Sequence, residues 1–286
     1  MRFLPLLLIA CVLMGQDSCE PEPPGPTKIF CQGSAGSVLL DDVNKLIDGA
    51  LAAIKHGTPS VDRRGTVKIN FDGYSCSGTI IGAHTVATAA HCGWTSDEHR
   101  ISLEQGGPVI ATSTEKLYHP DYPKYEANGD LVAREADVML LYTDDVLPPA
   151  EPEGDGIAEY IQIYQYELES KLCDDLIAQG FGQAEDPIEY PCPDGKAVCL
   201  REARYTVNAV DTGYMVPEGR LLRTGEFNPG KICFGDSGGP LYALTPNGPK
   251  LAGITSTTAS ADCEVHSHHV HAGNTEIKQW IMSNTR

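Results

Sequence analysis

Short runs in which apolar and polar residues alternate make up much of the chain after residue 65. In the first of them, TVKINF (66–71), Val67, Ile69 and Phe71 occupy every second position, with polar residues between them. This period of two is typical of a β-strand. Similar runs bounded by turn residues are TVATAA (85–90), DVMLLY (137–142), ARYTVNAV (203–210) and LAGITS (251–256). Many short strands separated by turns predict an all-β fold made of barrels or a sandwich.

The C-terminal end follows a different period. In NTEIKQWIMSN (274–284), Ile277, Trp280 and Ile281 recur at helical spacing. This spacing predicts a short amphipathic α-helix at the end of the chain.

Residues 1–15 have the pattern of a secretory signal peptide. Arg2 precedes the apolar run FLPLLLIACVLM (3–14), and Gly15 is a small residue at the expected cleavage point. The run is too short to span a membrane. The stretch LIAC (8–11) also resembles a bacterial lipobox, in which Cys11 would carry a lipid. Both interpretations predict export, either as a secreted, extracellular protein or as one tethered by lipid.

Residues 16–45 are expected to form a linker and pro-segment. The segment contains CEPEPPGP (19–26), whose prolines and glutamates cannot bury a core. We expect the folded domain to cover residues 46–286.

The charge balance narrows the classes of partner. The chain has 39 acidic and 21 basic side chains, and its formal net charge is −18. The electrostatic field of this negative charge repels phosphates and anionic lipid headgroups. We therefore expect no nucleic-acid binding and no binding to a membrane surface. With 286 residues, 41% of them apolar, the chain can bury the core of one large domain or of two compact ones.

The ten cysteines of an exported chain predict disulfides, because that compartment is oxidising. Cys11 and Cys19 lie in or near the signal. The other eight are Cys31, Cys76, Cys92, Cys173, Cys192, Cys199, Cys233 and Cys263. None of them forms a CxxC pair, so the cysteine spacing does not favour a zinc site.

Three segments carry residues suited to nucleophilic catalysis. CSGTIIGAHTVATAAHC (76–92) contains His91, EADVMLLY (135–142) contains Asp137, and GDSGGP (235–240) contains Ser237. Each residue alone has an ordinary structural explanation. Together they follow the chain order His, Asp, Ser of the catalytic triad in chymotrypsin.

On these motifs, the chain from about residue 46 to its end resembles the trypsin/chymotrypsin-like serine endopeptidases. TAAHC (88–92) and GDSGGP are highly specific, and ADVMLL (136–141) is similar to the strand that carries the family's aspartate. The resemblance implies two antiparallel six-stranded β-barrels, divided near residue 165, with the active site between them. It also implies peptide-bond hydrolysis through an acyl-enzyme, without a cofactor.

The resemblance assigns a role to each residue of the site. Ser237 is the nucleophile, His91 the general base and Asp137 the carboxylate that orients the imidazole. The amides of Gly235 and Ser237 form the oxyanion hole.

The motifs have two other interpretations. GDSGG also satisfies the GxSxG elbow of α/β-hydrolases, with Asp262 and His266 downstream, but too few residues follow Ser237 and the chain lacks βαβ units. A catalytically silent protease homologue that acts as a binding module is the main alternative. The complete triad, the oxyanion glycines and Asp236 argue against it.

The resemblance also implies two disulfides, one clamping the histidine loop and one tying the serine loop to the wall of the primary specificity pocket. They are Cys76–Cys92 and Cys233–Cys263. Cys192 and Cys199 flank PDGKAV (193–198) and would close a small local loop. As in chymotrypsin-like zymogens, a Cys31–Cys173 bridge would tether the pro-segment, although Cys19 competes for it.

The segment KLIDGALA (45–52) resembles the activation site of the family. Cleavage between Lys45 and Leu46 would create a new terminus, and its ammonium would pair with Asp236. The competing interpretation is a helix, because the apolar positions from Val43 to Ile54 fall on one helical face.

Lys231 occupies the position that the resemblance gives to the floor of the specificity pocket, with Ser256 and Thr258 in its wall. A lysine there disfavours a trypsin-like preference for Lys or Arg, since like charges would meet in a partly desolvated pocket. Two interpretations remain. The ammonium faces inward and recruits Glu or Asp, helped by a histidine of HSHHVH (266–271), or it turns outward and leaves a short pocket for Ala or Val that Thr258 narrows.

The remaining expectations concern metals and partners. The segment after Cys92 lacks an evident acidic calcium loop, so no calcium is expected. For HSHHVH a surface loop or a pocket lining is favoured over a metal site. The expected partners are protein or peptide substrates, an activating protease and protein inhibitors, and the protein is expected to be a monomer.

Overall fold

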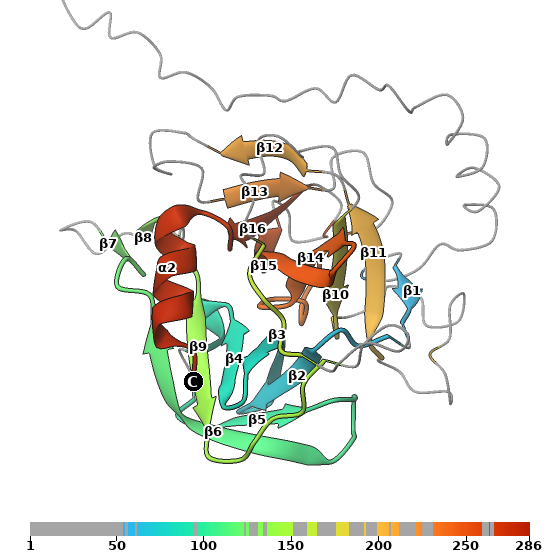
Figure 1. Ribbon diagram of the computed structural model, residues 1–286, viewed down its shortest axis with the longest axis vertical. Helices are drawn as coiled ribbons and strands as arrows, with labels where there is room; N and C mark the ends of the chain where they lie inside the picture. The colour runs from blue at the N-terminus through green and yellow to red at the C-terminus, as the bar shows by residue number, and fades with distance from the viewer. Residues whose placement is uncertain are drawn as a thin grey trace, which may run out of the picture.

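Figure 1 shows the computed structural model of the chain, with the most C-terminal strands and the helix in orange and red. It describes residue 54 and residues 57–286, apart from 61, 94–95, 123, 126–130, 134–135, 151–158, 165–175, 183–191, 193–198, 206, 212–220, 225–230, 259–262 and 264–265. The described residues form many short strands and a short C-terminal α-helix. The predicted all-β class with this helix is therefore confirmed.

Six antiparallel strands close the first barrel. In hydrogen-bonded order they are β2 (Thr66–Phe71), β3 (Tyr74–Gly82), β4 (Thr85–Thr88), β9 (Met139–Thr143), β6 (Val109–Tyr118) and β5 (His99–Ser102). Ile69 of β2 pairs with Cys76 on one side and with Ile101 on the other. Val67 and Ile69 are fully buried in the barrel core, as the alternating pattern predicts.

The other face of β2 is not a solvent face, although the sequence pattern places polar residues there. Lys68 is buried, and its ammonium lies 5.9 Å from the ring centroid of Phe181. Phe181 follows directly after β10 (Leu176–Gly180) of the second sheet. The strand is thus covered on both faces because the two halves of the protein pack against each other.

The second sheet has eight strands among the described residues. Their order is β1 (Thr58–Pro59), β11 (Arg201–Tyr205), β10, β14 (Pro240–Thr245), β15 (Gly248–Thr258), β16 (Ser267–His271), β13 (Leu221–Thr224) and β12 (Val207–Asp211). This sheet is not closed by hydrogen bonds within the part of the chain that the structure describes. β11 and β12 lie near opposite ends of the order, yet only residue 206 separates them in sequence. The covalent chain therefore links the two ends that hydrogen bonds would join in the expected second barrel.

Buried polar contacts fix the second sheet to the first barrel. The hydroxyl of Thr66 in β2 donates to Oε1 of Gln179 in β10 at 2.7 Å. The hydroxyl of Tyr242 in β14 donates to the carbonyl of Arg64 at 2.6 Å. Because unpaired polar groups are costly when buried, such contacts hold the two parts in one relative position. A small hairpin, β7 (Lys124–Tyr125) with β8 (Leu131–Ala133), lies outside both sheets.

The C-terminal helix α2 (Thr275–Asn284) follows β16 but lies beside β9 of the first barrel (Figure 1). The side chain of Asn274 caps it by accepting from the amide of Glu276 at 3.1 Å. Ile277 and Ile281 are buried, and Trp280 lies against His119 with ring centroids 4.9 Å apart. The helix thus packs against the barrel through Ile277, Trp280 and Ile281, the residues at helical spacing in the sequence. Within the described ranges, no helix has the length and apolar character needed to cross a membrane.

Candidate active site

His91 lies at the junction of the two sheets, in the short 3₁₀ helix η2 (Ala90–Gly93) that follows β4. The disulfide Cys76–Cys92 joins this turn to β3, with the two Cα atoms 6.4 Å apart. The neighbouring residue Ala90 is fully buried, whereas the His91 side chain is 22% exposed. The small buried residues of TAAHC thus anchor the turn and leave the imidazole at the surface of the junction.

Asp137 is completely buried just before β9 and faces His91 with both carboxylate oxygens. Oδ2 lies 2.7 Å from Nδ1 of His91, and Oδ1 accepts the backbone amide of His91 at 2.9 Å. Burial alone would raise the pKa of this carboxyl. The hydrogen bonds and charge of His91 together with the hydroxyl of Ser256 outweigh burial and hold the Asp137 pKa below its ordinary value.

Ser256 belongs to this charge network, a role that the sequence analysis did not foresee. Its hydroxyl donates to Oδ2 of Asp137 at 2.6 Å. The register between β15 and β16 shifts between Thr255 and Thr257, which puts Ser256 at a β-bulge. Bulges re-aim a side chain relative to the regular strand. No local sequence signal distinguishes this serine from its neighbours in ITSTTAS.

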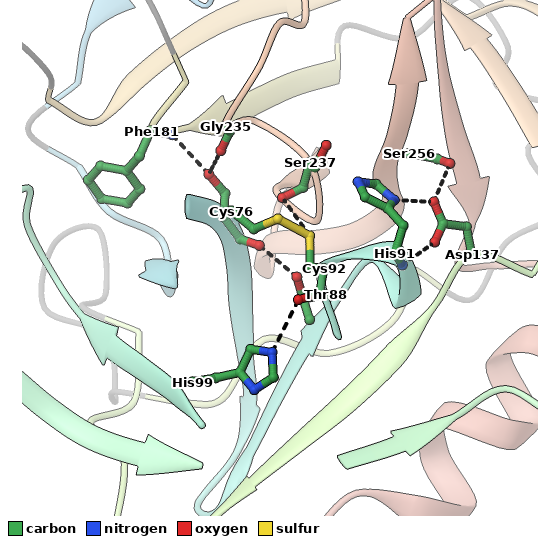
Figure 2. Close-up of a disulfide and its surroundings, with 11 residues drawn as sticks. Cys76, Thr88, His91, Cys92, His99, Asp137, Phe181, Gly235, Ser237 and Ser256 are labelled. Atoms are coloured by element: carbon green, nitrogen blue, oxygen red, sulfur yellow. Dashed lines mark hydrogen bonds and ion pairs between the residues drawn. A yellow bond between two sulfur atoms is a disulfide. The ribbon is translucent and has the colours of Figure 1, made fainter. Parts of the chain in front are cut away.

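Ser237 lies in the loop before β14, where its backbone is anchored to the first barrel. The amide of Ser77 in β3 donates to the carbonyl of Ser237 at 2.8 Å. In the view of Figure 2, the imidazole of His91 lies between Ser237 and Asp137. Three residues from three separate segments are thus gathered at one place.

Asp236, the residue before Ser237 in the nucleophile loop, is buried. Its carboxylate accepts the amides of Gly182 at 2.8 Å and Cys233 at 3.0 Å. A side chain at Gly182 would collide with this carboxylate, so glycine is required there. Burial raises the pKa of Asp236 to about 7, although the two amides and the charges of Lys68 and Arg201 lower it. The carboxylate is therefore only partly compensated by its present surroundings.

Lys231 is enclosed: the residue is 9% exposed. The outward-turned interpretation requires an exposed side chain, and Lys231 does not have one. Thr258 at the end of β15 is half-buried, and its hydroxyl oxygen is inaccessible to solvent. This low exposure argues against the outward-turned interpretation, and the inward-facing ammonium stays a prediction.

The histidine cluster forms strand β16 rather than a surface loop. His269 is fully buried, with Nε2 at 2.9 Å from Oγ1 of Thr224 and Nδ1 at 3.2 Å from Oγ1 of Thr255. Burial lowers its pKa to about 3, so the ring is neutral near pH 7. His269 therefore cannot supply positive charge to an acidic substrate. His266 and His268 contact each other edge to face, with ring centroids 5.0 Å apart.

All three disulfides between described cysteines pair as the sequence analysis expected: Cys76–Cys92, Cys192–Cys199 and Cys233–Cys263. Cys76, His91 and Cys92 place ligand atoms close enough for a metal ion. Because both thiols are consumed in the disulfide, this group is not a metal site. Lys45, Leu46, Cys31, Cys173 and Asp262 lie outside the described residues.

Comparison with known proteins agrees with this fold and geometry. The Trypsin family model matches residues 54–159. A vitellin-degrading protease of Bombyx mori is 30% identical over 200 residues, which make up 66% of this chain and 69% of that protein. Chymotrypsin-like elastase family member 1 of Homo sapiens is 27% identical over 211 residues, or 67% of this chain and 73% of that protein.

Solved structures give the same fold. Neuropsin, a serine protease expressed in the limbic system of mouse brain, aligns with a TM-score of 0.56 and 18% identity over 79% of this chain and 97% of its own. HL collagenase aligns with a TM-score of 0.59 and 21% identity over 80% and 96%. The chain belongs to the trypsin family of serine-type endopeptidases.

Proposed function

We propose that this chain is a secreted endopeptidase that uses Ser237 as its nucleophile, His91 as general base and Asp137 to orient the imidazole. The observation that carries the proposal is the buried Asp137 carboxylate, which lies 2.7 Å from Nδ1 of His91. A hydrogen bond at Nδ1 leaves Nε2 as the nitrogen that can take a proton. The opposite nitrogen is thus available to the hydroxyl of Ser237.

The reaction proceeds in two steps. Ser237 Oγ attacks the scissile carbonyl carbon while its proton moves to His91 Nε2, and the oxyanion is held by the amides of Gly235 and Ser237. His91 then gives the proton to the departing amine, which leaves an acyl-enzyme. In the second step, water attacks the acyl-enzyme with His91 again as the base, which releases the carboxylic acid and restores Ser237. One oxyanion donor contributes roughly 3–4 kcal/mol to lowering the barrier.

We also propose that the protein is made as a zymogen. Residues 1–15 would be the signal, residues 16–45 the linker and pro-segment, and residues 46–286 the peptidase domain. Cleavage after Lys45 by an activating protease would free the amine of Leu46. The raised pKa of Asp236 supports this assignment, because an incompletely compensated buried carboxylate provides a counter-ion for a new ammonium group.

The site is tested by labelling Ser237 with a fluorophosphonate and by peptide hydrolysis. Ser237→Ala and His91→Ala should abolish both signals without unfolding the protein. Asp137→Asn should lower kcat by roughly 10⁴-fold, because the imidazole would adopt the wrong tautomer. Hydrolysis that survives Ser237→Ala in a clean preparation would refute the assignment. A folded, cleaved chain that neither labels nor hydrolyses peptides would instead identify a binding module.

A further inference from the structure

Ser77 is a buried serine in β3 whose polar groups are all used in hydrogen bonds. Its amide donates to the carbonyl of Ser237 at 2.8 Å, and its carbonyl accepts the hydroxyl of Thr88 at 2.8 Å. Its hydroxyl donates to the carbonyl of Gly235 and accepts the amide of Phe181, both at 2.9 Å. Two of these four bonds end on the nucleophile loop, at the residues whose amides would form the oxyanion hole.

The direction of the hydroxyl's bonds is fixed by its partners. An amide N–H can only donate and a carbonyl can only accept. The Ser77 hydroxyl must therefore accept from Phe181 and donate to Gly235. In such a chain each bond polarises the next, which strengthens both. Neither alanine nor glycine at position 77 could make this connection.

The anchored carbonyl matters because Gly235 has little conformational restraint of its own. Its φ of 96° lies in the region that glycine enters without steric cost. The peptide group that joins Gly235 to Asp236 is held at its oxygen by Ser77 and at its nitrogen by the carbonyl of Cys233, 3.1 Å away. Once this group is fixed, the Gly235 amide can rotate through fewer orientations.

Ser77 acts in parallel with Asp236. The amide of Phe181 donates a hydrogen bond to the Ser77 hydroxyl, and the amide of the next residue, Gly182, donates one to the Asp236 carboxylate. The segment 181–182 is thus joined to the nucleophile loop by one hydroxyl and one carboxylate. Of these two side chains, the sequence pointed only to Asp236, and it did so as the partner of a new N-terminus.

We infer that Ser77 is a positioning residue for the oxyanion hole, holding Gly235 in the orientation that stabilises the transition state. This inference rests on the proposed protease function. Since the oxyanion forms only during the reaction, a misplaced donor should reduce transition-state binding more than substrate binding.

The test compares the activated enzyme with its Ser77→Ala variant. We expect kcat to fall about 10- to 100-fold, because small misplacements of catalytic groups have effects of this size, while KM changes little. The affinity for a peptide boronic acid, whose boronate oxygen occupies the oxyanion hole, should fall by the same factor as kcat/KM. The melting temperature is measured in parallel.

Thr66→Val is the matched control. Thr66 is also a buried hydroxyl at the junction of the two sheets, but it donates to Gln179 and not to the nucleophile loop. This variant should lose stability and keep both kcat and the boronate affinity. If Ser77→Ala does not fold, Ser77→Cys replaces it, because a thiol is a weaker donor and should give an intermediate loss.

Three outcomes separate the claims. A fall in kcat and boronate affinity with KM unchanged supports the inference. Unchanged kcat with a lower melting temperature, or a higher KM alone, overturns it and leaves Ser77 a structural residue. If the parent enzyme itself neither hydrolyses peptides nor reacts with the fluorophosphonate, the proposed function fails instead.

Discussion

The hydroxyl of Ser256 lies 2.6 Å from the same carboxylate oxygen of Asp137 that faces the imidazole of His91. A completely buried carboxylate is costly unless its oxygens accept hydrogen bonds. Ser256 therefore helps to keep Asp137 ionised, and it does so from the second sheet, whereas Asp137 and His91 belong to the first barrel. The catalytic geometry depends in this way on how the two sheets pack.

Removing this hydroxyl should weaken the enzyme moderately. Hydrogen bonds to charged groups contribute about 1.5–3 kcal/mol, so Ser256→Ala should reduce kcat/KM by roughly 10- to 100-fold and raise the pKa of Asp137. Steady-state kinetics as a function of pH measures this change. Thr143→Val removes another strand hydroxyl, which donates to the carbonyl of Asp145, and should leave kcat/KM intact. Equal kcat/KM in Ser256→Ala and the parent would contradict the prediction.

Cleavage after Lys45 should switch the enzyme on. The new ammonium would pair with Asp236, and removal of one partner from a buried ion pair costs roughly 3–5 kcal/mol. Asp236→Asn should therefore remain inactive even when cut. N-terminal sequencing of the active enzyme should give Leu-Ile-Asp-Gly. Active protein that begins well before Leu46 would show that another partner satisfies Asp236.

Burial of His269 should make this residue's own contribution to stability smaller in acid. Because its pKa is about 3 in the folded protein and about 6.5 when unfolded, the unfolded state binds the extra proton between these values. The contribution is present above about pH 6.5 and is lost as the pH falls toward 3. At pH 5 the loss amounts to about 2 kcal/mol. His269→Gln should therefore lose less unfolding free energy between pH 7 and pH 5, as measured by urea denaturation.

The control for this measurement is Thr224→Val, which removes a hydrogen-bond partner of His269 and no ionisable group. It should lower stability at both pH values and keep the difference between them. Asp236 changes stability in the opposite sense, since its raised pKa favours the folded state at low pH and this stabilisation is lost as the pH rises from about 4 to 7. If the change in unfolding free energy between pH 7 and pH 5 is the same in His269→Gln as in the parent, the prediction for His269 is contradicted.

The enclosed lysine at position 231 should govern which bonds are cut. An inward-facing ammonium favours cleavage after Glu or Asp, and a short apolar pocket remains the second option. Lys231→Asp should create or raise cleavage after Arg while weakening cleavage after Glu. A peptide library gives the profile of both enzymes. If the native enzyme prefers Arg or Lys, Lys231 is not the pocket floor and a carboxylate elsewhere in the chain supplies the specificity, for which the sequence offers Asp262 as a candidate.

Local patterns in the sequence were sufficient to predict the fold class and to propose the catalytic triad. The alternation in TVKINF predicts a strand because a β-strand turns every second side chain into the core, and Val67 and Ile69 are buried as expected. The helical spacing of Ile277 and Ile281 likewise predicts the contact that α2 makes. TAAHC and GDSGGP are contiguous motifs, so His91 and Ser237 could be proposed as catalytic residues without knowing how the chain folds.

The tertiary structure alone decided the contacts that support these residues. Ser256 is 119 positions away from Asp137, and Ser77 is 158 positions away from Gly235. Periodicity reports how a residue is buried within its own strand, and it carries no information about which distant segment packs on the other face. For this reason the alternation in TVKINF did not reveal that Lys68 is buried, and the expectation of a surface loop or a pocket lining for HSHHVH did not identify strand β16. The packing of the two sheets determines both features, because it brings these separate segments together and removes water from between them.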